Sequence, residues 1–157
     1  QLAANVNNVA QMQQAPQFSE EFSLLKKDEL KALQLSGHIF QPSNQIIFEK
    51  EYTIQPYTDI NGVGLLYFAA YPSINDFCEA HFMNTKMSKG ARYETKFSTA
   101  SRDVFFFANC NINDAIIYRF HHVSEINENL ILLQSSLSRK SDNFRMAHIF
   151  TIKKWHK

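Results

Sequence analysis

The chain has 157 residues, 45% of them hydrophobic, so it can bury the core of one ordinary domain without disulfides or metal ions. Its 16 Lys and Arg residues are scattered and nearly balance 15 Asp and Glu residues, which excludes the basic face of a nucleic-acid-binding protein. No apolar run approaches the ~20 residues of a membrane helix, and the two cysteines match no zinc motif. We therefore expect a cytoplasmic protein with no metal, no membrane segment and no nucleic-acid partner.

The first part of the chain is predicted to be a linker. Residues 1–17 are rich in Gln, Asn and Ala, and the chain does not begin with Met, so we expect a domain from a longer polypeptide. A helix is predicted to begin at Ser19, whose hydroxyl can cap it, and to end before Gly37. We assign residues 1–43 to a linker with a short amphipathic helix, and residues 44–157 to the folded domain.

The middle of the chain changes its hydrophobic period twice. Residues 45–55 alternate with a period of two, which predicts a half-buried strand. Residues 56–64 contain two glycines, which permit a tight connection. Residues 72–83 return to the helical period, and their predicted buried stripe consists of Ile74, Phe77, Cys78, His81 and Phe82.

The last part of the chain is predicted to consist of strands. Residues 92–110 indicate one long strand with a bend near residues 100–101, and residues 115–123, 130–138 and 144–155 indicate three more. The turns between them are rich in Asn and Asp, which favours consecutive antiparallel pairing. One helix beside such a sheet can bury its stripe only on the concave face of a curled sheet. This predicts an α+β hot-dog fold with about five strands.

A short segment before the predicted helix resembles the opening of hot-dog thioesterases, in which Asp, Gly and an Asn-Tyr pair lead into the central helix. In this chain the segment runs from Asp59 through Gly62 to Tyr71. Ala70 stands where those enzymes have Asn, and Val63 follows Gly62 where many of them have His. Both differences remove polar groups from the expected pocket, which argues against independent hydrolysis.

Three longer stretches, residues 64–76, 101–109 and 135–142, are similar to the second half of leinamycin-type acyltransferase/decarboxylases and related polyketide-biosynthesis proteins. The resemblance implies substrates held as thioesters of coenzyme A or an acyl carrier protein. The CoA or 4'-phosphopantetheine arm then belongs to the substrate, and no cofactor is bound. The resemblance also implies a second hot-dog unit, either a homodimer partner or a preceding repeat. The tyrosine that carries the acyl group belongs to the first repeat of those proteins, so none is assigned here.

Thioester chemistry requires a donor that polarises the carbonyl group and a carboxylate that acts as base or nucleophile. Backbone N–H groups at the start of the central helix can supply the donor. We predict Asp59 as the catalytic carboxylate, with Asn61 and Gly62 beside it. The alternative is that Asp59 and Asn61 only form an Asx-type turn, as such residues often do next to glycine.

Four residues are predicted to bind the substrate: Tyr71, Asp76, Glu79 and Arg139. Asp76 and Glu79 are three positions apart and share one face of the helix, although they can also be simply solvated there. Arg139 follows a strand near the end of the sheet, where the resemblance would place the entrance for the phosphate-bearing arm. A dispersed surface charge is the alternative for Arg139.

We expect a domain that processes acyl thioesters in a polyketide or fatty-acid-like pathway, by acyl transfer or decarboxylation. A non-catalytic domain that docks a carrier protein, or completes a pseudo-dimer, is the main alternative. Thioester hydrolysis and dehydration are further alternatives, so whether the chain is an enzyme stays open.

Overall fold

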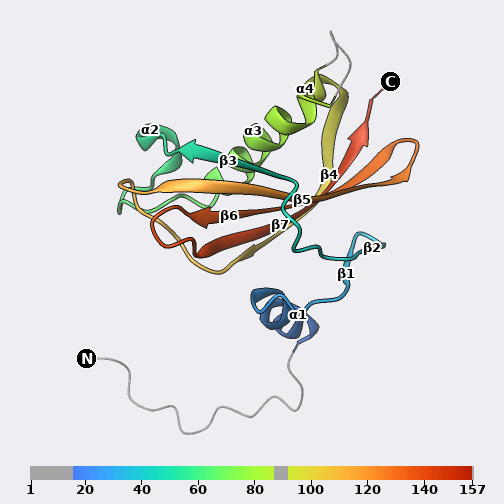
Figure 1. Ribbon diagram of the computed structural model, residues 1–157, viewed down its shortest axis with the longest axis horizontal. Helices are drawn as coiled ribbons and strands as arrows, with labels where there is room; N and C mark the ends of the chain where they lie inside the picture. The colour runs from blue at the N-terminus through green and yellow to red at the C-terminus, as the bar shows by residue number, and fades with distance from the viewer. Residues whose placement is uncertain (1–15, 87–91, 157) are drawn as a thin grey trace, which may run out of the picture. The chain divides into compact units, whose positions relative to one another are not determined.

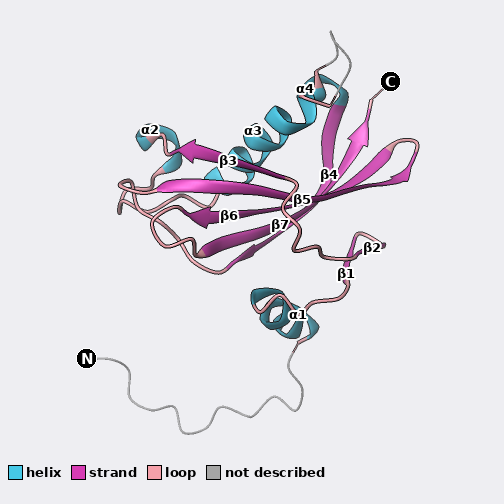
Figure 2. Cartoon of the chain, in the orientation of Figure 1, coloured by secondary structure: helices cyan, strands magenta, loops and turns pink. Residues whose placement is uncertain are grey.

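The computed structural model describes residues 16–86 and 92–156 (Figures 1 and 2). The chain divides into two compact units, one that ends at Leu30 and one that begins at Lys31. Within the described residues, all the strands belong to the second unit, together with three of the helices. Among the described residues, no helix is both long enough and apolar enough to cross a membrane.

The first unit contains α1 (Gln17–Lys26), which is shorter than the helix predicted from Ser19 towards Gly37. That prediction was wrong beyond Lys26 because Asp28 adopts a φ of 61°, a left-handed conformation typical of helix ends. Gly37 instead lies in a hairpin turn between β1 (Leu33–Leu35) and β2 (His38–Phe40). Its φ of 82° suits that turn, where a side chain would be strained.

Five antiparallel strands form the main sheet in the order β3-β5-β6-β7-β4. They are β3 (Phe48–Thr53), β4 (Phe97–Phe106), β5 (Ala115–Asn127), β6 (Leu130–Arg139) and β7 (Arg145–Trp155). The predicted bend in β4 is confirmed as a shift of register between Thr99 and Ser101. Residues at the start of the predicted strand form α4 (Tyr93–Lys96) instead, so the extended prediction was wrong there.

The long helix α3 (Ala70–Asn84) packs on one face of this sheet, which we call the helix face, while α2 (Pro56–Asp59) follows β3 (Figure 1). This confirms the predicted α+β arrangement of one long helix on an antiparallel sheet. The core between helix and sheet includes Ile74, Cys78 and Phe82 from the helix.

The predicted buried stripe of α3 was wrong at two positions, because Phe77 is 58% exposed and His81 is also exposed. Phe77 contacts the ring of Tyr52 edge-on, at 5.8 Å between centroids, and leaves its other side open. The helix turns Asn75 and Glu79 towards the sheet instead, where both are buried. Polar side chains occupy this position because they find hydrogen-bond partners there, as described below.

Residues 31–47, which we call the strap, cover the opposite face of the sheet. We call that face of the sheet the strap face. Phe40 of the strap meets Phe150 of β7 edge-on, with 5.2 Å between ring centroids. The backbone N–H and C=O of Ser43 both bond the side-chain amide of Gln134, at 2.8 and 2.9 Å. Much of the segment predicted to be linker therefore packs on the sheet.

Candidate active site

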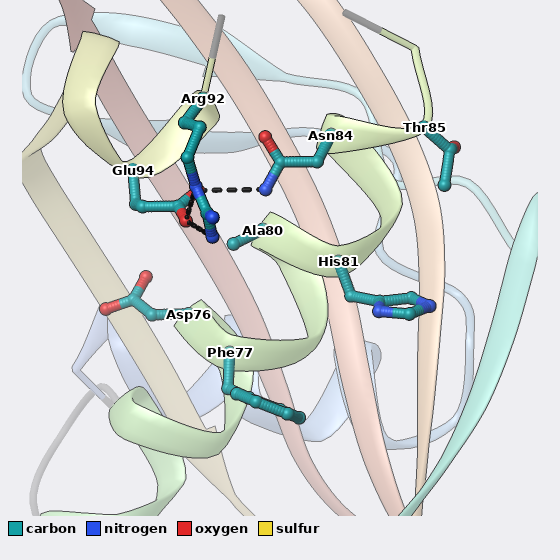
Figure 3. Close-up of a pocket in the computed structure, with 8 residues that line it drawn as sticks. All are labelled: Asp76, Phe77, Ala80, His81, Asn84, Thr85, Arg92 and Glu94. Carbon is teal, nitrogen blue, oxygen red and sulfur yellow. Dashed lines mark hydrogen bonds and ion pairs between the residues drawn. The ribbon is translucent and has the colours of Figure 1, made fainter. Parts of the chain in front are cut away.

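A pocket of about 650 Å³ lies along the exposed side of α3 (Figure 3). The apolar side chains of Phe77 and Ala80 line its middle, beside the ring of His81. Polar side chains surround them, and the described residues that line the pocket are Asp76, Phe77, Ala80, His81, Asn84, Thr85, Arg92 and Glu94. The pocket thus combines an apolar surface with a carboxylate, that of Asp76, at one side.

Asp76 is held by two cations that come from different strands. Arg102 of β4 donates to both carboxylate oxygens, at 3.2 and 2.5 Å, and Lys153 of β7 donates to Oδ1 at 2.7 Å. Although burial alone would raise the pKa of Asp76, the hydrogen bonds from Arg102 and Lys153 outweigh it and hold that pKa below its usual range. Asp76 is therefore an ionised carboxylate that reaches solvent, with 44% of its side chain exposed.

Glu79 lies one turn further along α3 but is only 1% exposed. Its Oε1 accepts a hydrogen bond from the Tyr93 hydroxyl at 2.8 Å and lies 3.2 Å from Lys153 Nζ. Its Oε2 accepts a bond from Asn75 Nδ2 at 3.3 Å. Burial raises the pKa of Glu79 despite the nearby ammonium group of Lys153. Asp76 and Glu79 thus share one cation but differ sharply in environment.

The residues predicted as catalytic lie in the segment before α3 and do not line this pocket. Asp59 is buried, and its carboxylate accepts bonds from Tyr52 Oη at 3.0 Å, Gln55 N at 2.7 Å and Thr58 Oγ1 at 3.0 Å. These contacts fix the short helix α2 to strand β3. A catalytic role for Asp59 stays a prediction.

Asn61 and Gly62 follow in the same loop. Asn61 Oδ1 accepts the backbone N–H groups of Val63 and Leu65, both at 3.0 Å, which is the pattern of an Asx-type turn. A Cβ atom at Gly62 would meet no heavy atom of the described residues within 4 Å, so the space around it is open there. The catalytic roles of both residues stay predictions.

The four predicted binding residues lie in three different places. Asp76 and Glu79 come together around Lys153, whereas Tyr71 is buried in the core and donates its hydroxyl hydrogen to Ala108 O at 3.0 Å. Arg139 lines a second, smaller pocket of about 360 Å³, where its guanidinium pairs with Asp142. Their roles in binding stay predictions, and only Asp76 lines the larger pocket.

Sequence reasoning missed the partners that hold the two carboxylates, namely Tyr93, Arg102 and the buried role of Lys153. A signal for Lys153 was available, because it continues the inward alternation of Ala147, Ile149 and Thr151 along β7. A charged residue at such an inward position needs a partner of opposite charge. The sequence does not say which helix residue supplies that partner.

The comparisons with known proteins concern the fold. No protein-family profile matches the chain, and no curated protein matches it. A thioesterase complexed with coenzyme A and Zn from Thermus thermophilus has a TM-score of 0.63 at 11% identity, over 72% of this chain and 86% of that one.

Two further solved structures are similar. A 1,4-dihydroxy-2-naphthoyl-CoA thioesterase from Synechocystis has a TM-score of 0.59 at 14% identity, over 69% of this chain and 80% of that one. A 4-hydroxybenzoyl CoA thioesterase from Pseudomonas sp. strain CBS-3 has a TM-score of 0.58 at 11% identity, over 69% of this chain and 83% of that one. The closer resemblance to leinamycin-type proteins stays a prediction. At these identities the likeness is one of architecture, and the chain has the hot-dog fold.

Proposed function

We propose that the chain processes acyl thioesters, and that hydrolysis of an acyl-CoA is the reaction that its candidate active site supports best. The observation that carries the proposal is the ionised carboxylate of Asp76 beside the apolar surface of Phe77 and Ala80. Three solved structures of the same fold, all described as thioesterases, support the choice of substrate class. Acyl transfer and decarboxylation stay predictions, because no feature of the pocket favours them.

In this proposal Asp76 acts as the general base. Its carboxylate takes a proton from a water molecule whose oxygen adds to the thioester carbonyl carbon. The carbon–sulfur bond then breaks, and the thiolate leaves and takes up the proton, so that a carboxylic acid and a free thiol are formed. Phe77 and Ala80 contact the acyl group. The ion pairs of Asp76 limit its basicity but fix its position, and a positioned base contributes about 10²–10⁴-fold.

The test compares two carboxylates in the same assay, which follows thiol release from a panel of acyl-CoA substrates. Asp76→Asn should lower kcat/KM by at least ~10²-fold with the fold retained. Asp59→Asn is the matched variant, because it makes the same change at the buried carboxylate that the sequence predicts as the catalytic one. A loss with Asp59→Asn and none with Asp76→Asn would transfer the role of base to Asp59.

A second candidate function is a non-catalytic domain that docks a carrier protein or pairs with another hot-dog unit. The observation that favours it is the open edge of β4, whose only neighbour in the five-stranded sheet of the described residues is β7. Phe68, which is 64% exposed, contacts Phe106 at the end of this strand. An edge strand beside an exposed aromatic ring is a surface for strand addition.

Two measurements separate the candidates. Sedimentation equilibrium should detect a dimer if β4 pairs with a second unit, and a monomer at all concentrations would contradict that pairing. Binding of an acyl carrier protein, without turnover of any acyl-CoA or acyl-carrier substrate, would favour the docking domain.

We also propose a cytoplasmic location, since Cys78 and Cys110 are both unpaired and buried.

A further inference from the structure

Lys153 is shared by two carboxylates that differ in their access to solvent. Its Nζ lies 2.7 Å from Asp76 Oδ1 and 3.2 Å from Glu79 Oε1, and its side chain is 7% exposed. Asp76 lines the pocket, whereas Glu79 is enclosed between α3 and the sheet. One buried cation therefore connects a carboxylate that can meet substrate with one that cannot.

Glu79 is fixed in this position from two sides. The hydroxyl of Tyr93 donates to Oε1, and the amide of Asn75 donates to Oε2. Asn75 is itself held by Ser135 of β6, whose hydroxyl donates to Asn75 Oδ1 at 2.5 Å. Tyr93, Asn75 and Lys153 therefore hold both oxygens of the Glu79 carboxylate in place. Its own oxygens have no direct access to the pocket.

The charge of the cluster depends on Glu79. With Glu79 ionised, two carboxylates balance Arg102 and Lys153, and the cluster is neutral. With Glu79 protonated, Lys153 forms an ion pair with Asp76 alone, and the cluster carries one positive charge. Because like charges in a buried site interact strongly, Asp76 binds a proton more tightly when Glu79 is ionised.

The other titratable groups near Asp76 come from several elements. Arg102 of β4 and Lys153 of β7 pair with it directly, and Tyr93 of α4 and Tyr118 of β5 face the two carboxylates. Burial raises the pKa of both tyrosines far above the neutral range, so they stay protonated. Arg92, Glu94 and His81 line the same pocket as Asp76, and Arg92 and Glu94 pair with each other. Glu79 is thus the group near Asp76 whose burial moves its titration towards neutral pH.

We propose that Glu79 and Lys153 are positioning residues for Asp76, and that the ionisation of Glu79 sets how strongly Asp76 attracts a proton from water. The inference rests on the proposed role of Asp76 as base. Loss of the proton from Glu79 then draws Lys153 partly away from Asp76, and the carboxylate in the pocket becomes a stronger base. The pH dependence of turnover follows Glu79, which never touches the substrate.

The first test needs no turnover. The carboxyl carbon of Glu79 is followed by ¹³C NMR as a function of pH in the wild type and in Asp76→Asn. Removal of the neighbouring negative charge should move the Glu79 titration to lower pH by about one unit or more. The matched control is Glu49→Gln, which breaks an ion pair with Arg119 elsewhere and should leave the Glu79 titration in place. An unchanged titration in Asp76→Asn would overturn the inference.

The second test uses the pH profile of kcat/KM. The wild type should lose turnover along an acid limb centred above pH 4.5, the ordinary value for Glu, whereas Glu79→Gln should lack this limb and be slower at neutral pH. A limb that persists in a folded Glu79→Gln variant would contradict the inference while leaving Asp76 as the base. If the wild type turns over no acyl-CoA, the proposed function fails, and the NMR titration still decides whether the two carboxylates are coupled.

Discussion

The two faces of the main sheet both bury polar side chains, but they do so with different chemistry. On the helix face the buried polar groups include ionisable ones: Glu79 and Lys153 lie beneath α3, and Arg102 and Asp76 connect them to the pocket. Such a cluster is expensive to form, since each buried ion loses several kcal/mol of hydration. An ionic cluster of this kind at the wall of a pocket favours a catalytic role over a purely structural one.

On the strap face the buried polar groups are His, Gln and Ser side chains that bond the strap or one another. His121 bonds the backbone carbonyl of Gln45 at 3.0 Å and the hydroxyl of Ser136 at 2.8 Å, while Gln134 bonds Ser43 and also His148. These contacts satisfy the backbone of the strap as a further strand would. The pocket along α3, by contrast, is lined by Asp76 of the charged cluster. The comparison indicates that the strap face is built for stability, and it favours a functional role for the helix face.

The largest effect should come from removing the strap. A chain that begins at Lys31 keeps it, whereas a chain that begins at Asn44 loses the buried side chains of Leu33, Leu35 and Phe40. Each such side chain contributes about 1.5–3 kcal/mol, so the shorter chain should lose on the order of 5 kcal/mol or fail to fold. Denaturant unfolding of both chains measures the difference. Equal stabilities would support the domain boundary predicted at residue 44.

An intermediate effect should separate the two sides of α3. Ile74 is buried in the core, so Ile74→Ala should lower the free energy of unfolding by about 2–5 kcal/mol. Phe77 is mostly exposed, so Phe77→Ala should lower it by less than ~1.5 kcal/mol, well below the cost of deleting a core aromatic. Phe77→Ala should instead raise KM for an acyl-CoA. If Phe77→Ala destabilised the protein as much as Ile74→Ala, the buried stripe predicted from the sequence would be correct.

The sequence predicted the sheet well because β-rich runs separated by turns rich in Asn and Asp are a local pattern. Residues 130–138 and 144–155 are two such runs, and they correspond closely to β6 and β7. The rotation of α3 could not be predicted in this way. An apolar Phe77 and a polar Glu79 border the same stripe, and the partners that decide between them come from the distant residues Tyr93 and Lys153.

The site and the strap were foreseen only in part for the same reason. Asp76 was named as a binding residue, but its contact with Arg102 joins positions 26 apart in the sequence. The strap has no marked periodicity, and its bond from Ser43 to Gln134 spans 91 residues. Long-range hydrogen bonds of polar side chains leave no signal in local spacing, whereas apolar strands do.

The smallest of these effects concerns His148, at the centre of the strap face. Because the amide nitrogen of Gln134 donates to His148 Nε2 at 2.8 Å, the ring accepts there and is neutral. Burial, and then the nearby Arg145 and His121, hold its pKa well below the ordinary 6.5. In the unfolded chain His148 binds a proton below about pH 6.5, whereas in the folded protein it does not. The free energy of unfolding should therefore fall as the pH drops below 6.5, and His148 contributes up to ~1.4 kcal/mol per pH unit to that fall.

His148→Gln isolates this contribution, since the oxygen of the new amide can still accept the bond from Gln134 but cannot titrate. Denaturant unfolding between pH 7 and pH 5 should give a shallower pH dependence for the variant than for the wild type, with the two curves approaching each other as the pH falls. Identical slopes would mean that His148 becomes protonated in the folded state. In that case the strap face would tolerate a buried charge, and the contrast between the two faces of the sheet would not hold.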